Sequence, residues 1–195
     1  MNTNRKNHWE TIYKTKLPNE VSWTQEKPET SLDFIQETHL GKSAKIIDIG
    51  GGDSKLVDFL LDESFENITV LDISEKAIEK AREINKQLNL NTTFICCDIY
   101  DLPNHLNEKF DIVFTSYGTI GWLPDLNKWA KVVSHFLKPD GKFVMADFHP
   151  VVWMFDNDFR EVFYNYFNTE EIIEDVFEND VKLDYCVTPN RVYEF

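Results

Sequence analysis

The sequence predicts an α/β fold, with a doubly wound, mostly parallel sheet and helices on both faces. Three observations support this prediction. Short apolar runs recur between residues 44 and 146, segments with helical spacing separate them, and the first run ends at three consecutive glycines. With 195 residues, of which 42% are hydrophobic, the chain is long enough to form one domain with a substantial core.

Five segments carry the strand signal, because each is a short apolar run of the kind found in strands that are buried on both faces. They span residues 44–49, 68–71, 93–97, 112–115 and 143–146. Helices are expected between strands where apolar residues recur three or four positions apart. One such helix covers residues 77–88 with Ser74 as its N-cap, and another covers 126–136 and stops before Pro139-Asp140-Gly141.

The two ends of the chain lie outside this alternation. Residues 1–43 predict two helices, over 5–14 and 29–39. Near the other end, residues 181–187 and 191–195 flank Thr188-Pro189-Asn190, a pattern that allows a terminal antiparallel hairpin. The chain stops inside this last apolar run, which is the pattern expected of a shortened chain.

The charge of the chain disfavours one class of partner. Its 34 acidic and 20 basic residues give a formal net charge of −14. A surface this negative repels phosphate backbones, so we expect no nucleic-acid substrate. Acidic residues are concentrated after residue 150, where they solubilise the surface or steer a cationic partner.

Cellular location follows from apolar runs and cysteines. No window approaches the ~18 consecutive apolar residues that a membrane span requires. The start, MNTNRKNHWE, lacks the apolar core of a signal peptide. The chain has three cysteines, and the adjacent Cys96 and Cys97 are poorly placed to pair with each other. The sequence therefore predicts a cytoplasmic protein with reduced thiols and no membrane partner.

The most informative motif is the glycine turn after the first strand, Asp48-Ile-Gly50-Gly-Gly52-Asp53-Ser54. Glycines allow the backbone to adopt positive φ and to approach a ligand closely. Ligands of open parallel sheets bind beyond the carboxyl ends of the strands, where this turn lies. A structural turn also requires glycine, so the neighbouring residues decide what the turn binds.

Two nucleotide-like cofactors compete for this turn. A dinucleotide site needs a third small residue, and the corresponding position is Lys55. Asp48 and Asp53 flank the turn and would repel a pyrophosphate, whereas they suit the ammonium and sulfonium charges of S-adenosylmethionine. The turn therefore favours S-adenosylmethionine over NAD, and an NAD-dependent oxidoreductase is the alternative.

Two further carboxylates follow the next strands. Asp72 lies 20 residues beyond Gly52, at the spacing expected of an acidic residue that accepts the ribose hydroxyl hydrogens. It is also suited to cap the following helix. Asp98 ends the third strand, where it can accept from the adenine amino group while Ile99 packs on the ring.

Residues 44–148 resemble a class I S-adenosylmethionine-dependent methyltransferase with a Rossmann-like fold. The motifs are DIGGGDS at 48–54, VLDIS at 70–74, CDIYDLP at 97–103, FDIVFTSYG at 110–118 and LKPDGKFVMADF at 137–148. Ser54 departs from the family, many members of which have a third glycine there. By position, the resemblance assigns Asp48, Gly50 and Gly52 to the methionine end, Asp72 with Ile73 to the ribose, Asp98 with Ile99 to the adenine, and Ser116 with Tyr117 to the border of the transferred methyl group.

The amino-terminal segment extends the resemblance. The pattern His8-Trp9-(x)3-Tyr13, followed by VSWTQ at 21–25, is similar to the lid of small bacterial methyltransferases and, more distantly, of thiopurine-type enzymes. Trp9, Tyr13 and Trp23 would then close over the cofactor, because a sulfonium attracts aromatic faces. The alternative is that these rings only pack the helices onto the sheet.

The resemblance implies a single domain of residues 1–195 in three parts. These are an N-terminal helical lid (1–43), a cofactor-binding core (44–148) and a C-terminal acceptor or edge region (149–195). Family members usually complete the sheet with two further strands and an insertion over the acceptor, and only about 45 residues remain here for both. A cofactor-binding module without turnover is therefore a further alternative.

The acceptor is the least determined part of the prediction. His149 is the best proton acceptor by residue type, and Tyr117 is a second catalytic candidate. Residues 115–118 lack the Asn/Asp-Pro-Pro-Tyr motif of enzymes that methylate amide or nucleobase amino groups, and no Cys/His cluster has metal-ligand spacing. We therefore expect a small-molecule acceptor and no metal, with a lysine side chain of a basic protein as the alternative. The sequence predicts no oligomeric state.

Overall fold

The computed structural model describes residues 2–17, 20–21, 24–88, 92–147, 149–156, 159–167, 172–178 and 181–187. The chain divides into two compact units, Met1–Ala146 and Asp147–Phe195. The division falls near the expected boundary between residues 148 and 149. The assignment of the three segments as lid, core and edge region stays a prediction.

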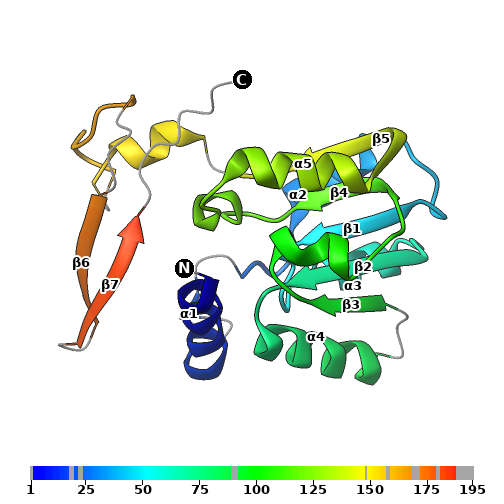
Figure 1. Ribbon diagram of the computed structural model, residues 1–195, viewed down its shortest axis with the longest axis horizontal. Helices are drawn as coiled ribbons and strands as arrows, with labels where there is room; N and C mark the ends of the chain where they lie inside the picture. The colour runs from blue at the N-terminus through cyan, green and yellow to red at the C-terminus, as the bar shows by residue number, and fades with distance from the viewer. Residues whose placement is uncertain are drawn as a thin grey trace. The chain divides into compact units, whose positions relative to one another are not determined.

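The first unit contains a five-stranded parallel sheet in the order β3-β2-β1-β4-β5 (Figure 1). Its strands are β1 (Lys45–Ile49), β2 (Asn67–Asp72), β3 (Thr92–Cys96), β4 (Phe110–Thr115) and β5 (Leu137–Met145). All five predicted strands are therefore present. β5 begins six residues earlier than predicted and includes the expected turn, where Asp140 has a φ of +65° and the register against β4 shifts.

Helices cover both faces of this sheet. They are α1 (Asn2–Thr15), α2 (Glu29–Gln36), α3 (Leu56–Asp62), α4 (Glu75–Gln87) and α5 (Leu126–Phe136), with short 3-10 helices η2 (Ile99–Asn104) and η3 (Ile120–Trp122). Helix α2 contacts α3 and β5 on one face, and α5 contacts η2, β4 and β5 on the other (Figure 1). The prediction of a doubly wound α/β fold is confirmed. Helix α3 was not predicted, because its seven residues are too few for a clear apolar period.

Side-chain caps fix the starts of two helices. The Ser74 hydroxyl accepts a hydrogen bond from the backbone N–H of Ala77 at 3.2 Å, as predicted from the sequence. Asp125 caps α5 by accepting from the Lys128 N–H at 2.8 Å. Both caps follow loops at the carboxyl ends of strands, so they fix where these loops turn back into helices.

The core lies on both faces of the central strands. Ile46 of β1 and Ile112 of β4 are opposite each other and fully buried, and Phe114 and Leu60 pack into the same cluster. A sheet with helices on both faces needs such apolar strands. Because the strands are parallel, their carboxyl ends meet at one edge, and this edge carries the predicted site.

The second unit contains the 3-10 helix η4 (Pro150–Met154) and an antiparallel hairpin of β6 (Ile172–Glu178) and β7 (Val181–Val187). The predicted strand 181–187 is present, and among the described residues it pairs with the segment before it. Only two residues separate these strands along the chain, the shortest common hairpin connection. Residues 191–195, the predicted partner, lie outside the described residues.

Across the described part of the chain, no helix combines the length and the apolar character needed to cross a membrane.

Candidate functional site

Backbone hydrogen bonds hold the carboxyl ends of four strands together. The Gly50 N–H donates to the Leu71 carbonyl at 2.8 Å, the Ser116 N–H to Ile49 at 3.2 Å, and the Cys97 N–H to Asp72 at 3.0 Å. These bonds connect the loops after β1, β2, β3 and β4. The predicted residues after these strands therefore lie along one edge of the sheet.

The glycine turn adopts a backbone that favours glycine at two positions. Gly50 has a φ of +77° and Gly52 a φ of +51°, both in the left-handed region. A side chain at Gly50 would collide with Thr119, and one at Gly52 would collide with the Tyr13 hydroxyl. Both glycines therefore permit close approach to the backbone, and in this structure side chains of the same chain make that approach.

The carboxylate of Asp48 lies fully buried beneath this turn. One oxygen, Oδ1, accepts a hydrogen bond from the Ser116 hydroxyl at 2.7 Å, whereas Oδ2 has no partner among the described residues. Burial raises the pKa of Asp48 to about 6, and the bond from Ser116 acts in the opposite direction. Gly51 has no side chain that would occupy the space of this carboxylate. An unpartnered buried oxygen next to a glycine turn suits a cationic or hydrogen-bond-donating ligand.

Asp72 is also buried at the end of β2. Its Oδ1 accepts from the Ser74 N–H at 2.8 Å. Burial raises its pKa to about 7; the backbone hydrogen bonds from Ser74 and Gly52 lower it, and the charges of Asp48 and Asp53 raise it. Asp72 thus combines the predicted position for ribose binding with the alternative role of organising the turn before α4.

Asp98 caps η2 and carries an ion pair that was not predicted. Its Oδ1 accepts from the Tyr100 N–H at 3.1 Å, and its Oδ2 lies 2.6 Å from Nη2 of Arg5. Ile99 is buried, with 6% of its surface exposed, and Ile73 is half-buried. The predicted adenine residues are therefore at the expected edge, and α1 already contacts Asp98.

The aromatic residues of α1 cluster beside the loop after β4. The ring of Trp9 lies 5.1 Å from that of Trp122 and 6.4 Å from that of Tyr13, and His8 stacks on Trp122 at 4.9 Å. Burial lowers the pKa of His8. The cluster is compatible with both predicted roles, closing over a cofactor or packing α1 onto the sheet. Trp23 lies outside the described residues.

The two catalytic candidates lie in different environments. The half-buried Tyr117 follows β4 and packs against the hydrophobic core. His149 is exposed and belongs to the second unit, where its Nδ1 accepts from the Val151 N–H at 3.2 Å and caps η4. Its ring stacks on Tyr166 at 6.3 Å. The structure gives His149 a capping role, and its catalytic role stays a prediction.

Arg5 and Glu10 are two residues at this edge that sequence reasoning missed. The Glu10 carboxylate accepts from the N–H groups of Glu75 and Lys76 at 2.6 and 3.3 Å, at the start of α4. A signal for Arg5 was present in the sequence. Arg5 lies four residues before Trp9 and eight before Tyr13, so it shares one helix face with these two aromatic residues. Which side chains that face would contact depends on how α1 docks, and the spacing gives no information about docking.

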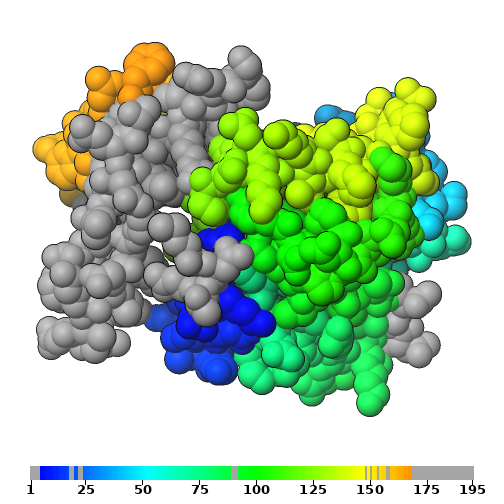
Figure 2. Space-filling view, in the orientation of Figure 1, coloured from blue at the N-terminus to red at the C-terminus, as the bar shows by residue number. Residues whose placement is uncertain are grey.

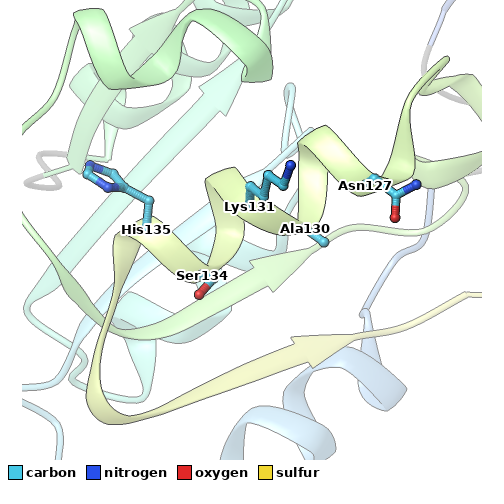
Figure 3. Close-up of a pocket in the computed structure, with 5 residues that line it drawn as sticks. All are labelled: Asn127, Ala130, Lys131, Ser134 and His135. Atoms are coloured by element: carbon cyan, nitrogen blue, oxygen red, sulfur yellow. The ribbon is translucent and has the colours of Figure 1, made fainter. Parts of the chain in front are cut away.

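A separate surface hollow lies on α5 (Figure 3). It has a volume of about 720 Å³, and five exposed residues of this helix line it: Asn127, Ala130, Lys131, Ser134 and His135. None of them was predicted to bind a cofactor, and all of them come from one helix. The buried carboxylates and the glycine turn do not line this hollow; they lie at the edge of the sheet where the strands end.

Comparison with known proteins decides the family. A family model described as a methyltransferase domain matches residues 40–193, which is most of the chain. The chain belongs to the methyltransferase-domain family. This assignment agrees with the resemblance to class I S-adenosylmethionine-dependent methyltransferases and disfavours the NAD-dependent alternative.

Individual relatives of this methyltransferase domain are distant. The ubiquinone/menaquinone biosynthesis C-methyltransferase UbiE of Rickettsia peacockii is 28% identical over 152 residues, which cover 74% of this chain and 60% of that protein. The structure of the PH0226 protein from Pyrococcus horikoshii has a TM-score of 0.63 at 24% identity, covering 92% of this chain and 84% of that one. A methyltransferase from Thiobacillus denitrificans, solved with S-adenosyl-L-homocysteine, has a TM-score of 0.51 at 20% identity, covering 61% and 48%.

The residues at the strand-end edge fit S-adenosylmethionine, the cofactor predicted for this methyltransferase domain. The unpartnered Oδ2 of Asp48 and the raised pKa values of Asp48 and Asp72 indicate buried carboxylates whose burial is not offset by a cation among the described residues. The positive φ of Gly50 and Gly52 suits close approach of a ligand to the backbone. S-adenosylmethionine provides ribose hydroxyl donors and two positive charges, and it carries no phosphate that these carboxylates would repel.

Proposed function

We propose that this chain is an S-adenosylmethionine-dependent methyltransferase that acts on a small-molecule acceptor. The observation that carries the proposal is the pair of buried carboxylates, Asp48 and Asp72, beside the glycine turn of a methyltransferase-domain chain. The Rickettsia relative, named for methylation of carbon in quinone biosynthesis, supports a small organic acceptor. Because the chain spans 60% of that relative's length, the acceptor is proposed only as a class.

Bound S-adenosylmethionine would supply an electrophilic methyl group on a sulfonium sulfur. Asp72 would accept hydrogen bonds from the ribose hydroxyls, and Asp98 with Ile99 would hold the adenine. Asp48, whose carboxylate Ser116 orients, would place negative charge at the cationic methionine end. These residues bind and orient the methyl donor, and proximity is the main contribution that such an enzyme makes to in-line displacement.

Residues beyond β4 and β5 would contact the acceptor. We propose Tyr117 for this role and keep His149 as the candidate proton acceptor. If His149 acts as a base, its Nδ1 must give up the hydrogen bond from Val151 or its Nε2 must take the proton. Replacing His149 by glutamine therefore tests the base and the cap together, and a change in the pH profile of methyl transfer separates them.

Calorimetry on the full chain tests the cofactor part of this proposal. S-adenosylhomocysteine should bind at a one-to-one ratio, whereas NAD should not bind. Asp72→Asn should weaken S-adenosylhomocysteine binding by about 1–3 kcal/mol, because buried hydroxyl donors lose a charged acceptor. Tight binding of NAD without any response to S-adenosylhomocysteine would refute the proposal.

A transfer assay with methyl-labelled cofactor tests the acceptor part. Hydroquinones, amines and thiols would be offered beside lysine-containing basic peptides. Label on a small molecule supports the proposal, and label on peptides alone would replace the acceptor class with protein side chains. Binding without transfer to any acceptor that longer relatives methylate would make the chain a cofactor-binding module.

We also propose a cytoplasmic location. Cys96 and Cys97 support it, because both are free thiols in the structure. Burial raises the pKa of Cys97 to about 12, so this thiol stays protonated and reacts slowly. Fractionation of cells that express the tagged full chain would test the location.

A further inference from the structure

Helix α1 lies against the edge of the sheet where the predicted cofactor residues gather. It contacts α4, and Figure 2 shows α1, in blue, beside that helix. Arg5, Trp9 and Tyr13 are spaced by four residues, so they share the helix face that meets this edge. Each end of this face contacts a residue that was predicted to bind the cofactor.

The first contact is the ion pair between Arg5 and Asp98. The two side chains are only 18% and 11% exposed, and the guanidinium also lies 5.5 Å from the centre of the Tyr100 ring. Asp98 is the carboxylate predicted for the adenine amino group. Its Oδ1 accepts from the Tyr100 N–H and its Oδ2 from Arg5. Both oxygens are therefore engaged within the chain.

The second contact places Tyr13 over the glycine turn. Its hydroxyl occupies the space that a side chain at Gly52 would take. Asp72 Oδ2 lies 3.4 Å from the position that a Cβ atom on Gly52 would have. With α1 in this position, Asp72 is only 8% exposed.

A third contact anchors α1 away from these residues. The Glu10 carboxylate accepts from the first two N–H groups of α4, where the helix dipole favours a negative charge. Neither Glu75 nor Lys76 was predicted to bind the cofactor. Glu10 therefore holds α1 in place through a contact that the cofactor does not need.

From these contacts we infer that α1 is an internal competitor of the cofactor. Arg5 occupies the acceptor for adenine and Tyr13 the space beside the ribose carboxylate, so α1 must withdraw before the cofactor binds. The inference rests on the proposed function, since it takes S-adenosylmethionine as the ligand of this edge. It differs from a helix that only covers a cofactor already bound.

The two arrangements predict opposite effects of loosening α1. For a competitor, only the withdrawn fraction binds, so a larger withdrawn fraction raises both the association rate and the affinity. For a helix that only covers bound cofactor, loosening speeds dissociation and lowers the affinity. The sign of the affinity change therefore distinguishes them.

Stopped-flow tryptophan fluorescence with S-adenosylhomocysteine measures this sign on the full chain. Arg5→Ala and Glu10→Gln should each raise the association rate and the affinity by about tenfold, the scale of one lost charge-assisted hydrogen bond. Lys14→Ala is the matched control, because it removes one positive charge from an exposed site on the same helix. Its rate and affinity should stay within about twofold of the wild-type values.

Unchanged or weaker binding by Arg5→Ala and Glu10→Gln would overturn the inference. If S-adenosylhomocysteine binds neither the wild type nor any variant, the proposed function fails and the inference fails with it. Trypsin cleavage of the unmodified protein provides a second readout, because α1 and the residue after it contain four cleavage sites, Arg5, Lys6, Lys14 and Lys16. Saturating S-adenosylhomocysteine should accelerate cleavage at these sites, and protection would contradict the competitor role.

Discussion

Replacing Asp72 with asparagine should stabilise the ligand-free protein at neutral pH while it weakens cofactor binding. Burial raises the pKa of Asp72 from 3.8 to about 7 in the folded chain. The folded carboxyl group therefore binds a proton more tightly than the unfolded one. Stability consequently falls as pH rises through the interval between these two values.

The size of the effect follows from the same values. The difference between 3.8 and about 7, at about 1.4 kcal/mol per pKa unit, corresponds to about 4 kcal/mol above pH 7. About 2–3 kcal/mol of this should develop between pH 5 and pH 8. Asparagine keeps an oxygen for the Ser74 N–H, which Asp72 holds at 2.8 Å, and it carries no charge.

Urea unfolding from pH 5 to pH 8 measures this difference. The unfolding free energy of Asp72→Asn should exceed that of the wild type by an amount that grows with pH. Calorimetry at pH 7.5 should show the accompanying loss of S-adenosylhomocysteine affinity. Parallel pH profiles for the two proteins would show that Asp72 is not the group whose ionisation costs stability, and the argument from burial would be wrong.

Three further substitutions and one control test the site and the core by urea unfolding. Ser116→Ala removes the hydrogen bond to the buried Asp48 and should cost about 1–3 kcal/mol; a neutral result would mean that solvent reaches this carboxylate. Gly52→Ala forces a side chain into a φ of +51° and should cost at least about 1–2 kcal/mol. Gly41→Ala, which meets open space, is its control and should cost less than about 1 kcal/mol. Phe114→Ala empties a fully buried position and should cost about 3–5 kcal/mol, whereas a loss below about 1 kcal/mol would contradict its place in the core.

Much of the fold could be predicted from the sequence, because local patterns specify buried parallel strands. The apolar runs at 44–49 and 112–115 became β1 and β4, and both lie at the centre of the sheet. Helix α3 was missed because seven residues are too few to show a clear helical spacing of apolar residues. The pairing of β7 with β6 was not predicted, because strand pairing depends on tertiary context as much as on local pattern.

The site was predictable where it depends on topology alone. Asp48, Asp72 and Asp98 each lie at or just beyond the carboxyl end of a parallel strand, so their common edge follows from the strand directions. The ion pair of Arg5 was not predictable, because it depends on how α1 docks against the sheet. The capping role of His149 was missed for a related reason, since residue type alone suggested a base.

The strand order also determines when the sheet can be completed during synthesis. β1, β2 and β3 are neighbours both in the chain and in the sheet, so they can pair as soon as they emerge. The other edge of β1 pairs with β4, so Ile46 cannot pair until Ile112 has been synthesised. At about 5–20 residues per second, the ribosome needs several seconds to make the intervening segment. Until then an apolar edge is exposed to other nascent chains, and this interval is when the protein is most prone to misassemble.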